Sequence, residues 1–334
     1  MPFQERIDTH SHFVPPLYRS ASEQTGHGKP DGMPAVPQWS EEAHLELMQN
    51  LSVTKSIISI TSPGTHLVPG DDALARKLTR ECNTFAAELS HRRPKQFGFW
   101  ASLPLPDVPA SLDELTYAMD ELHADGIALL TNHHGRYLGD AAFDPVFAEL
   151  ERRRATVFIH PTAPCIAHSG SRDVTPALPL SQYPNPMFEF FFDTARAAIN
   201  LFLSGTVLRC PNVTFILSHG AGALPPLIER FSSFATAVTG LGMRLSSEMV
   251  KETLRRQFFV DLAGFVFPDQ IHVVVRYVGA KQLLYGSDWC YTPTPTVLML
   301  AEKMEEGLKE FFPDEEARRE ILLGNARRIL GRRG

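Results

Sequence analysis

The segment Asp8-Thr9-His10-Ser11-His12 ends the first predicted strand, which begins at Ile7. Side chains alternate between the two faces of a strand, so His10 and His12 point to the same side. Two imidazoles on one side of a strand can bind the same divalent metal ion. A chain with 13 histidines can contain one such pair by chance. The interpretation therefore depends on what the rest of the chain places beside this pair.

Three later segments repeat the arrangement. In each of them a short apolar run ends in a possible metal ligand or acid-base group, and a loop follows. The segments are Phe158-Ile159-His160-Pro161, Ile216-Leu217-Ser218-His219-Gly220 and Leu284-Tyr285-Gly286-Ser287-Asp288-Trp289.

Apolar runs of strand length alternate with helix-like stretches along the chain. Eight strands, each followed by helical sequence, predict an α/β fold in which a parallel sheet closes into a (β/α)8 barrel. An open doubly wound sheet is the main alternative, but no glycine-rich phosphate loop follows the first strand. The predicted strands are Ile7–His12, Ser56–Ile60, Phe97–Trp100, Ile127–Leu130, Thr156–His160, Val213–Ser218, Phe258–Asp261 and Leu283–Tyr285.

Local signals predict helix starts and long loops. Ser40, with acidic residues in the turn that follows, is a predicted helix N-cap. Ser111 and Glu114 form a predicted capping box for a later helix. Residues 15–39, rich in proline and glycine, and residues 162–186 are predicted loops that cover the C-terminal mouth of the barrel.

The composition excludes several classes of protein. The net charge is -6 and the basic runs at residues 152–154 and 332–333 are short, so no nucleic-acid partner is expected. No apolar stretch approaches membrane-spanning length and no signal peptide is predicted, so no membrane association is expected. Four dispersed cysteines without a CxxC pair fit a reducing cytosol, which predicts a cytoplasmic protein. With 43% hydrophobic residues and no internal repeat, residues 1–334 are predicted to form a single barrel domain.

The barrel places the candidate ligands together. His10 and His12 end the first strand, His160 ends the fifth and Asp288 follows the eighth, and the C-terminal ends of barrel strands converge on one face. Three neutral imidazoles and one carboxylate suit Zn²⁺, with a position left for water or substrate. Mn²⁺, Fe²⁺ and Co²⁺ remain alternatives. His219, after the sixth strand, is a fifth group at this mouth that can hold an oxygen ligand or shuttle a proton.

Further candidates have competing structural interpretations. Trp289 and Tyr291 either form the wall of an aromatic pocket or pack under a loop, and Arg230 either faces a substrate carboxylate or lies on a helix surface. For the other histidines and cysteines near the predicted mouth, an ordinary loop histidine or a passive thiol is the better interpretation. These residues are His66, His133, His134, Cys165 and Cys290.

The order of the motifs DTHSHF, FIHP, LSHGAGALP and YGSDW resembles the amidohydrolase superfamily and, within it, the aminocarboxymuconate-semialdehyde decarboxylase family. The resemblance covers nearly the whole chain, including residues 323–330. It implies metal ligands at His10, His12, His160 and Asp288, a catalytic histidine at His219, and Asp288 as the acid that protonates the substrate. Hydrolases of the superfamily often use a carbamylated lysine that bridges two metals. No lysine ends the third, fourth or fifth strand here, so a site with one metal is implied.

The resemblance also bears on the substrate. Arg230 aligns with a family arginine that reaches a substrate carboxylate across a dimer interface, which implies a homodimer. A second carboxylate-binding arginine, present in some relatives after the first strand, has no clear match, which argues against a dicarboxylate. Within the family the chain is most similar to fungal salicylate-type decarboxylases of polyketide pathways. The implied substrate is a small aromatic carboxylic acid, 6-methylsalicylate, which would give 3-methylphenol and CO₂.

Two other functions remain open. A hydrolase that opens a lactone or amide with a metal-bound hydroxide would use the same ligands, and release of CO₂ would distinguish the two reactions. A catalytically silent barrel acting as a binding module would function without metal, and the intact ligand set argues against it.

Overall fold

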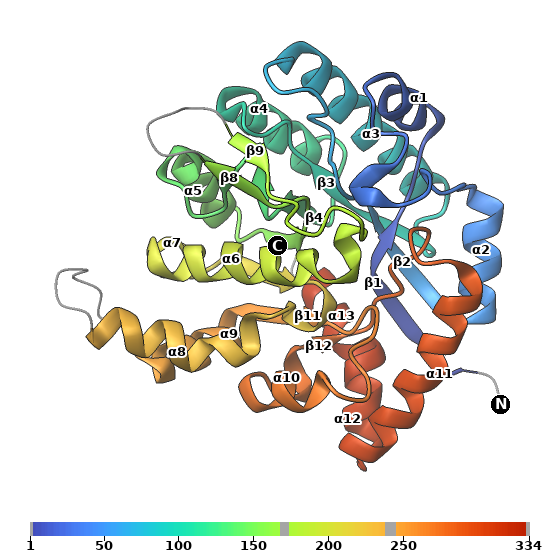
Figure 1. Ribbon diagram of the computed structural model, residues 1–334. Coiled ribbons are helices and arrows are strands. Elements are labelled where there is room, and N and C mark those ends of the chain that lie inside the picture. Colours follow the sequence, from blue (N-terminus) through green and yellow to red (C-terminus); the bar gives the residue numbers. More distant parts are fainter. Residues whose placement is uncertain (1–2, 168–173, 238–244, 332–334) are drawn as a thin grey trace.

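Eight parallel strands form one sheet in the computed structural model, which describes residues 3–167, 174–237 and 245–331. Each strand pairs with the next one in the sheet order, and helices surround the strands (Figure 1). The predicted (β/α)8 barrel is therefore confirmed. The strands, in sheet order, are β1 (Arg6–His12), β2 (Val53–Ser59), β3 (Phe97–Ser102), β4 (Gly126–Leu130), β7 (Thr156–His160), β10 (Thr214–Leu217), β11 (Phe258–Asp261) and β12 (Leu283–Leu284).

The barrel closes between β1 and the segment that follows β12. Ser11 forms an isolated parallel bridge with Trp289. The backbone N–H of Thr9 donates to the carbonyl of Tyr285 at 3.0 Å, and the N–H of Asp288 donates to the carbonyl of His10 at 2.8 Å. The first and last strands of the sheet thus meet at this seam, which places Asp288 beside the end of β1.

Most helices lie in the connections between strands, and the last ones follow β12. Ser40 caps α2 as predicted, because its side chain accepts a hydrogen bond from the backbone of Ala43 at 3.1 Å. None of the helices in the described ranges is long and apolar enough to cross a membrane. The helices are α1 (Pro16–Gln24), α2 (Glu41–Asn50), α3 (Asp72–Arg92), α4 (Val108–Asp120), α5 (Asp144–Arg152), α6 (Glu189–Leu203), α7 (Thr206–Arg209), α8 (Leu224–Ala237), α9 (Ser247–Gln257), α10 (Ile271–Tyr277), α11 (Thr294–Phe311), α12 (Glu315–Arg319) and α13 (Asn325–Leu330).

Short elements fill the loops at both ends of the barrel. Two small antiparallel pairs, β5 with β6 and β8 with β9, lie apart from the main sheet. The short elements are β5 (Asn132–His133), β6 (Arg136–Tyr137), β8 (Cys165–Ala167), β9 (Val174–Pro176), η1 (Pro30–Gly32), η2 (Ala141–Phe143), η3 (Asn185–Met187), η4 (His219–Ala221), η5 (Ala280–Gln282) and η6 (Glu320–Gly324).

The inside of the barrel is filled by one apolar cluster. Each of seven strands contributes one fully packed side chain, and residues near the C-terminus close the cluster. The ring of Phe158 in this cluster contacts the ring of His10, with centroids 4.9 Å apart. The cluster therefore forms the floor beneath the C-terminal mouth. Its buried members are Ile7, Ile57, Trp100, Phe158, Ile216, Phe259, Leu284, Leu323, Ala326 and Ile329.

Two local predictions were wrong. The predicted loop at residues 15–39 contains helix α1, which begins after Pro15 and buries Tyr18. The capping box at Ser111 and Glu114 does not form, because Asp107 caps α4 one turn earlier by accepting from the backbone of Ala110 at 3.2 Å. Ser111 then lies inside the first turn. Part of the other predicted loop, residues 168–173, lies outside the described residues.

Candidate metal centre and active site

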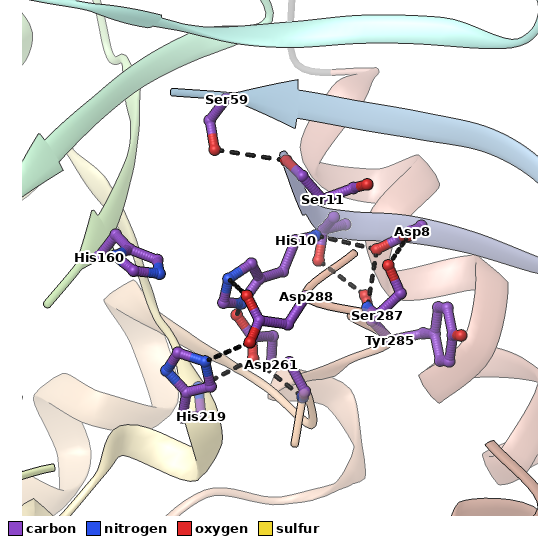
Figure 2. Close-up of polar contacts among 12 residues, drawn as sticks. Asp8, His10, Ser11, Ser59, His160, His219, Asp261, Tyr285, Ser287 and Asp288 are labelled. Atoms are coloured by element: carbon purple, nitrogen blue, oxygen red, sulfur yellow. Dashed lines mark hydrogen bonds and ion pairs between the residues drawn. The ribbon is translucent and has the colours of Figure 1, made fainter. Parts of the chain in front are cut away.

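Four predicted ligands meet at the C-terminal mouth of the barrel. His10, His12, His160 and Asp288 each offer one atom within 4.8 Å of the others. The Nε2 atoms of His10 and His12 are 3.1 Å apart. Oδ1 of Asp288 lies 3.3 Å from Nε2 of His10 and 3.1 Å from Nε2 of His12. Figure 2 shows His10 of β1, His160 at the end of β7 and Asp288 of the loop after β12 pointing toward one another. The structure therefore contains a metal-binding site built from these residues.

Hydrogen bonds on the far side of each ring fix its orientation. Nδ1 of His10 donates to Oδ2 of Asp261 at 2.9 Å. Nδ1 of His12 lies 3.3 Å from the carbonyl of Ser59, and Nδ1 of His160 lies 2.7 Å from the carbonyl of the residue that follows it. When Nδ1 is used in this way, the lone pair of Nε2 is left for a metal.

The protonation states suit a cation site. Burial lowers the pKa of His12 and holds the pKa of His160 well below its ordinary value. Both are therefore neutral, which is the form that binds a metal. Burial also acts to lower the pKa of His10, but the charge and hydrogen bond of Asp261, together with Asp288, outweigh it and raise the pKa to about 10. Without metal, His10 thus carries a proton in the place that a cation would take.

Asp288 connects the ligand cluster to His219. Burial acts to raise the pKa of Asp288, but hydrogen bonds with His10, His12 and His219 outweigh it and hold the pKa well below the usual range. Oδ1 faces the two histidines of β1, whereas Oδ2 lies 3.5 Å from Nε2 of His219. Thr292 donates to Oδ2 at 3.1 Å. One oxygen of the ionised carboxylate therefore faces the histidine ligands of β1, and the other faces His219, which can donate a proton.

His219 occupies the position expected for a fifth group at the mouth. It begins η4 directly after β10, and its φ of 54° turns the chain sharply. Its backbone N–H donates to Oδ1 of Asp261 at 2.9 Å, and its carbonyl accepts from Gln270 at 2.9 Å. The ring of Phe191 stacks on it at a centroid distance of 6.2 Å. Its backbone and ring are thus held beside Asp288.

A cavity of about 240 Å³ opens beside this cluster. Aromatic rings form much of its wall, and no lysine or arginine within the described ranges lines it. Its polar and aromatic lining consists of Asp31, Thr61, Ser62, His160, Phe190, Phe191, His219, Phe265, Asp288, Tyr291, Thr292 and Thr296.

The two aromatic residues predicted near the site have different positions. Tyr291 lines the cavity and its ring contacts His12 edge to face, with centroids 5.6 Å apart. Trp289 is buried elsewhere, against the ring of His44 at 4.7 Å, and its indole N–H donates to Thr294 at 3.1 Å. Tyr291 is thus placed to contact a ligand, whereas Trp289 is packed in the interior against His44, beneath the loop that follows β12.

Comparison with known proteins identifies the family of the chain. The sequence model of the amidohydrolase family matches residues 7–332. The chain belongs to the amidohydrolase family. The decarboxylase yanB of Aspergillus niger is 40% identical over 311 residues, which cover 90% of this chain and 81% of that protein. The 6-methylsalicylic acid decarboxylase of Penicillium expansum is 36% identical over 330 residues, which cover 98% and 96%.

A solved structure supports the fold. The 5-carboxyvanillate decarboxylase of Novosphingobium aromaticivorans, crystallised with manganese and 4-hydroxy-3-methoxy-5-nitrobenzoic acid, superposes with a TM-score of 0.82 at 20% identity, covering 98% of this chain and 96% of that one. The predicted resemblance to the family and to fungal decarboxylases is confirmed.

Two carboxylates of this amidohydrolase were not assigned a role from sequence. Asp261 supports both His10 and the backbone of His219. Asp8 accepts from the hydroxyl and backbone N–H of Ser287 at 2.6 and 3.1 Å. Burial raises the pKa of Asp8 to about 7 although these hydrogen bonds oppose the shift. Both residues lie on predicted strands, and Asp261 ends one, which is the same signal that identified His160.

The weaker candidates lie away from the cluster. Arg230 is on an exposed face of α8 and does not line the 240 Å³ cavity. His66, His133, His134 and Cys165 line a separate cavity of about 370 Å³, where Nε2 of His134 and Nδ1 of His66 are 2.9 Å apart. Cys290 is buried as a free thiol. Within one chain of this amidohydrolase, none of these six residues lines the cavity beside the ligand cluster.

Proposed function

We propose that this amidohydrolase is a metal-dependent, non-oxidative decarboxylase of a small hydroxybenzoate, converting 6-methylsalicylate to 3-methylphenol and CO₂. The observation that carries the proposal is the ligand cluster of three imidazoles and one carboxylate facing a small aromatic cavity. At about 240 Å³ the cavity is below the usual range of roughly 300–1,000 Å³ for drug-sized ligands, which suits a single ring. The fungal relatives named as decarboxylases support the reaction class.

We propose Zn²⁺ as the native metal, with Mn²⁺ as the alternative. Imidazole ligands suit zinc, whereas the manganese in the related 5-carboxyvanillate decarboxylase supports the alternative. A divalent cation held by His10, His12, His160 and Asp288 would act as a Lewis acid that offsets negative charge on the carboxylate and phenolic oxygens of the substrate. No redox cofactor is required, because the electron pair of the broken bond returns to the ring.

Asp288 is the proposed acid of the reaction. It is ionised in the free site, so it must first gain a proton, and His219 at 3.5 Å from Oδ2 is placed to supply it. Asp288 then transfers this proton to the ring carbon that bears the carboxylate. The bond between the ring and the carboxylate breaks, CO₂ leaves, and the ring regains its aromatic electrons. Phe191 and Tyr291 line the cavity in which the ring would lie, so their side chains would limit the access of water.

We further propose a homodimer in which Arg230 serves the active site of the partner chain. Phe192 of α6 is 48% exposed and Phe234 of α8, one turn after Arg230, is 58% exposed. The two helices pack together, so these rings and Arg230 can contribute to one interface.

Mixed subunits test the position of Arg230. Neither Arg230→Ala nor Asp288→Asn alone should be active. If Arg230 acts across the interface, mixing the two variants should restore part of the activity, since one site of each mixed dimer has both residues. Native mass spectrometry verifies that the mixture contains mixed dimers. If such a mixture recovers no activity, Arg230 does not act across the interface.

The setting of the protein is also proposed. We infer a single-domain cytoplasmic enzyme of polyketide secondary metabolism. The free state of all four cysteines is consistent with a reducing compartment. The fungal 6-methylsalicylic acid decarboxylases support the metabolic role.

The decisive experiment combines metal analysis with a substrate screen. Purified protein is analysed for bound metals and incubated with a series of hydroxybenzoates, and loss of CO₂ is followed by mass spectrometry. We expect 6-methylsalicylate to give 3-methylphenol, and a chelator to stop the reaction. Absence of CO₂ release together with hydrolysis of a lactone or amide would overturn the proposal in favour of the hydrolase, which shares all four ligands.

A further inference from the structure

Asp31 places a second carboxyl group in the wall of the cavity beside the metal site. It lies in η1, between α1 and α2, and lines the cavity together with Ser62 and Tyr291. Nδ2 of Asn185 donates to Oδ1 of Asp31 at 3.2 Å, and the side chain of Ser62 is a second hydrogen-bond partner. Partners from two other segments of the chain therefore hold this carboxyl group in position.

No lysine or arginine among the described residues of the cavity wall faces Asp31. Among the described residues that line the cavity, the carboxyl groups are those of Asp31 and Asp288. Asp288 is already engaged with the histidine cluster. Burial raises the pKa of Asp31, although hydrogen bonds from Ser62 and Asn185 oppose the shift. Burial thus already disfavours the ionised form of Asp31, and a second negative charge beside it would add to this cost.

This arrangement affects a substrate with one carboxylate differently from a substrate with two. The first carboxylate of a bound aromatic acid can bind at the metal site. A second carboxylate would lose its water on entering an aromatic cavity, would meet no lysine or arginine of this chain in the described part of the wall, and would face Asp31. Like charges placed opposite each other in a binding site commonly cost several kcal/mol, about 10²-fold or more in affinity.

We propose that Asp31 is a specificity-determining residue that restricts the cavity to aromatic acids with a single carboxylate. The inference rests on the proposed function of the same site and deepens it, because it gives a physical reason for the choice of a monocarboxylate.

Asp31→Asn is the sharpest variant for a test. It removes the charge and keeps the size of the side chain. Residue 31 has φ 52° and ψ 28°, a left-handed conformation that Asn adopts as readily as Asp, so the backbone need not change. Asp31→Ala serves as a second variant that also removes the charge. Asp269→Asn is the matched control, because Asp269 is exposed and does not line the cavity.

The substrates are tested in pairs. Each methylsalicylate is compared with the salicylate that carries a second carboxylate at the same ring position, so the members of a pair differ mainly in charge. We expect Asp31→Asn to raise kcat/KM for at least one dicarboxylate by about tenfold or more, with methylsalicylates changing less than about threefold. Asp269→Asn should leave every ratio unchanged. An unchanged ratio, or a lower kcat/KM for the dicarboxylates, in both Asp31 variants would overturn the inference.

Binding measurements separate this inference from the proposed reaction. If the wild-type protein decarboxylates none of the methylsalicylates, the proposed function fails. The same acid pairs are then titrated calorimetrically into the zinc-loaded protein. Tighter binding of a dicarboxylate by Asp31→Asn than by the wild type, by about tenfold, would still support the role of Asp31. Equal binding would refute it.

Discussion

Replacement of Asp261 by Asn should weaken metal binding although it removes no ligand. Oδ2 of Asp261 accepts from Nδ1 of His10 at 2.9 Å, while Oδ1 accepts from the backbone N–H groups of His219 and Ala263 at 2.9 and 3.1 Å. In the variant these two N–H groups hold the amide oxygen, so the amide NH₂ faces His10. A donor in that place requires an unprotonated Nδ1, which moves the proton of neutral His10 to Nε2. That nitrogen then has no lone pair for the metal.

The size of the effect follows from the position of Asp261. Burial acts to raise its pKa, but the charge of His10 outweighs this and lowers it, so the carboxylate is ionised in the native site. Loss of a hydrogen-bonded carboxylate behind a metal-bound histidine typically costs about 10–100-fold in metal affinity, or roughly 1.4–2.8 kcal/mol. Because Asp261 is fully buried and water screens it poorly, we expect a value near the upper end, about 100-fold.

The assay is competition for Zn²⁺ between the protein and a chromophoric chelator. The dissociation constant is compared for the wild type, Asp261→Asn and the exposed control Asp269→Asn, and circular dichroism of the metal-free proteins verifies the fold. At saturating Zn²⁺ part of the turnover of Asp261→Asn should return, since excess metal selects the competent tautomer. A folded variant whose metal affinity lies within about twofold of the wild type would refute the tautomer argument.

Three further changes are predicted. Asp288→Asn should lower kcat for CO₂ release by about 10³-fold or more, because an amide cannot deliver the proton; a variant with bound metal and most of its activity would exclude the acid role. His219→Gln should keep its metal, measured by elemental analysis, but lose about 10²-fold in kcat, and normal turnover would show that the proton arrives by another route. Burial raises the pKa of Asp8 to about 7. The neutral carboxyl group of Asp8 therefore stabilises the metal-free protein, and this contribution is complete below about pH 4 and is lost as the pH rises through 7. Asp8→Asn should flatten this dependence in urea unfolding, and an unchanged slope would contradict it.

The barrel and the ligand cluster could be predicted because both depend on where strands end. An apolar run that stops at a polar side chain marks a C-terminal strand end, and a barrel brings all such ends to one face. His160 is identified by this rule alone. Asp288 follows a similar rule, since it comes three residues after the last apolar run, which ends at Tyr285. Their mutual contact requires no knowledge of loops or helices.

Features that depend on partners distant in sequence could not be predicted. Asp261 ends a strand as His160 does, but its role depends on His10, which is 251 positions away. Trp289 and Tyr291 are both aromatic, so residue type does not distinguish their positions. In the structure Trp289 pairs with Ser11 at the seam, and only Tyr291 of the two lines the cavity. Local signals cannot report such a bridge.

The capping box failed for a similar reason. Asp107 and Ser111 are both good N-caps, so local sequence alone does not choose between them. In the structure Glu114 instead joins α4 to α3, because its carboxylate accepts hydrogen bonds from Asn83 and Arg80 of α3 at 2.7 Å each. With Glu114 engaged in helix packing, the helix begins at the earlier cap, one turn before the predicted one.

The contacts that close the barrel also build the metal site. The carbonyl of His10 accepts from the backbone N–H groups of Ser287 and Asp288 at 3.1 and 2.8 Å, and Asp8 binds Ser287 through both its backbone and its hydroxyl. Main-chain bonds therefore place Asp288 beside His10 without help from a metal. A cation that binds ligands from both sides of this seam requires the closed barrel. Its binding free energy then adds to the stability of closure, because a chain opened between β1 and β12 would separate His10 and His12 from Asp288 and lose the site.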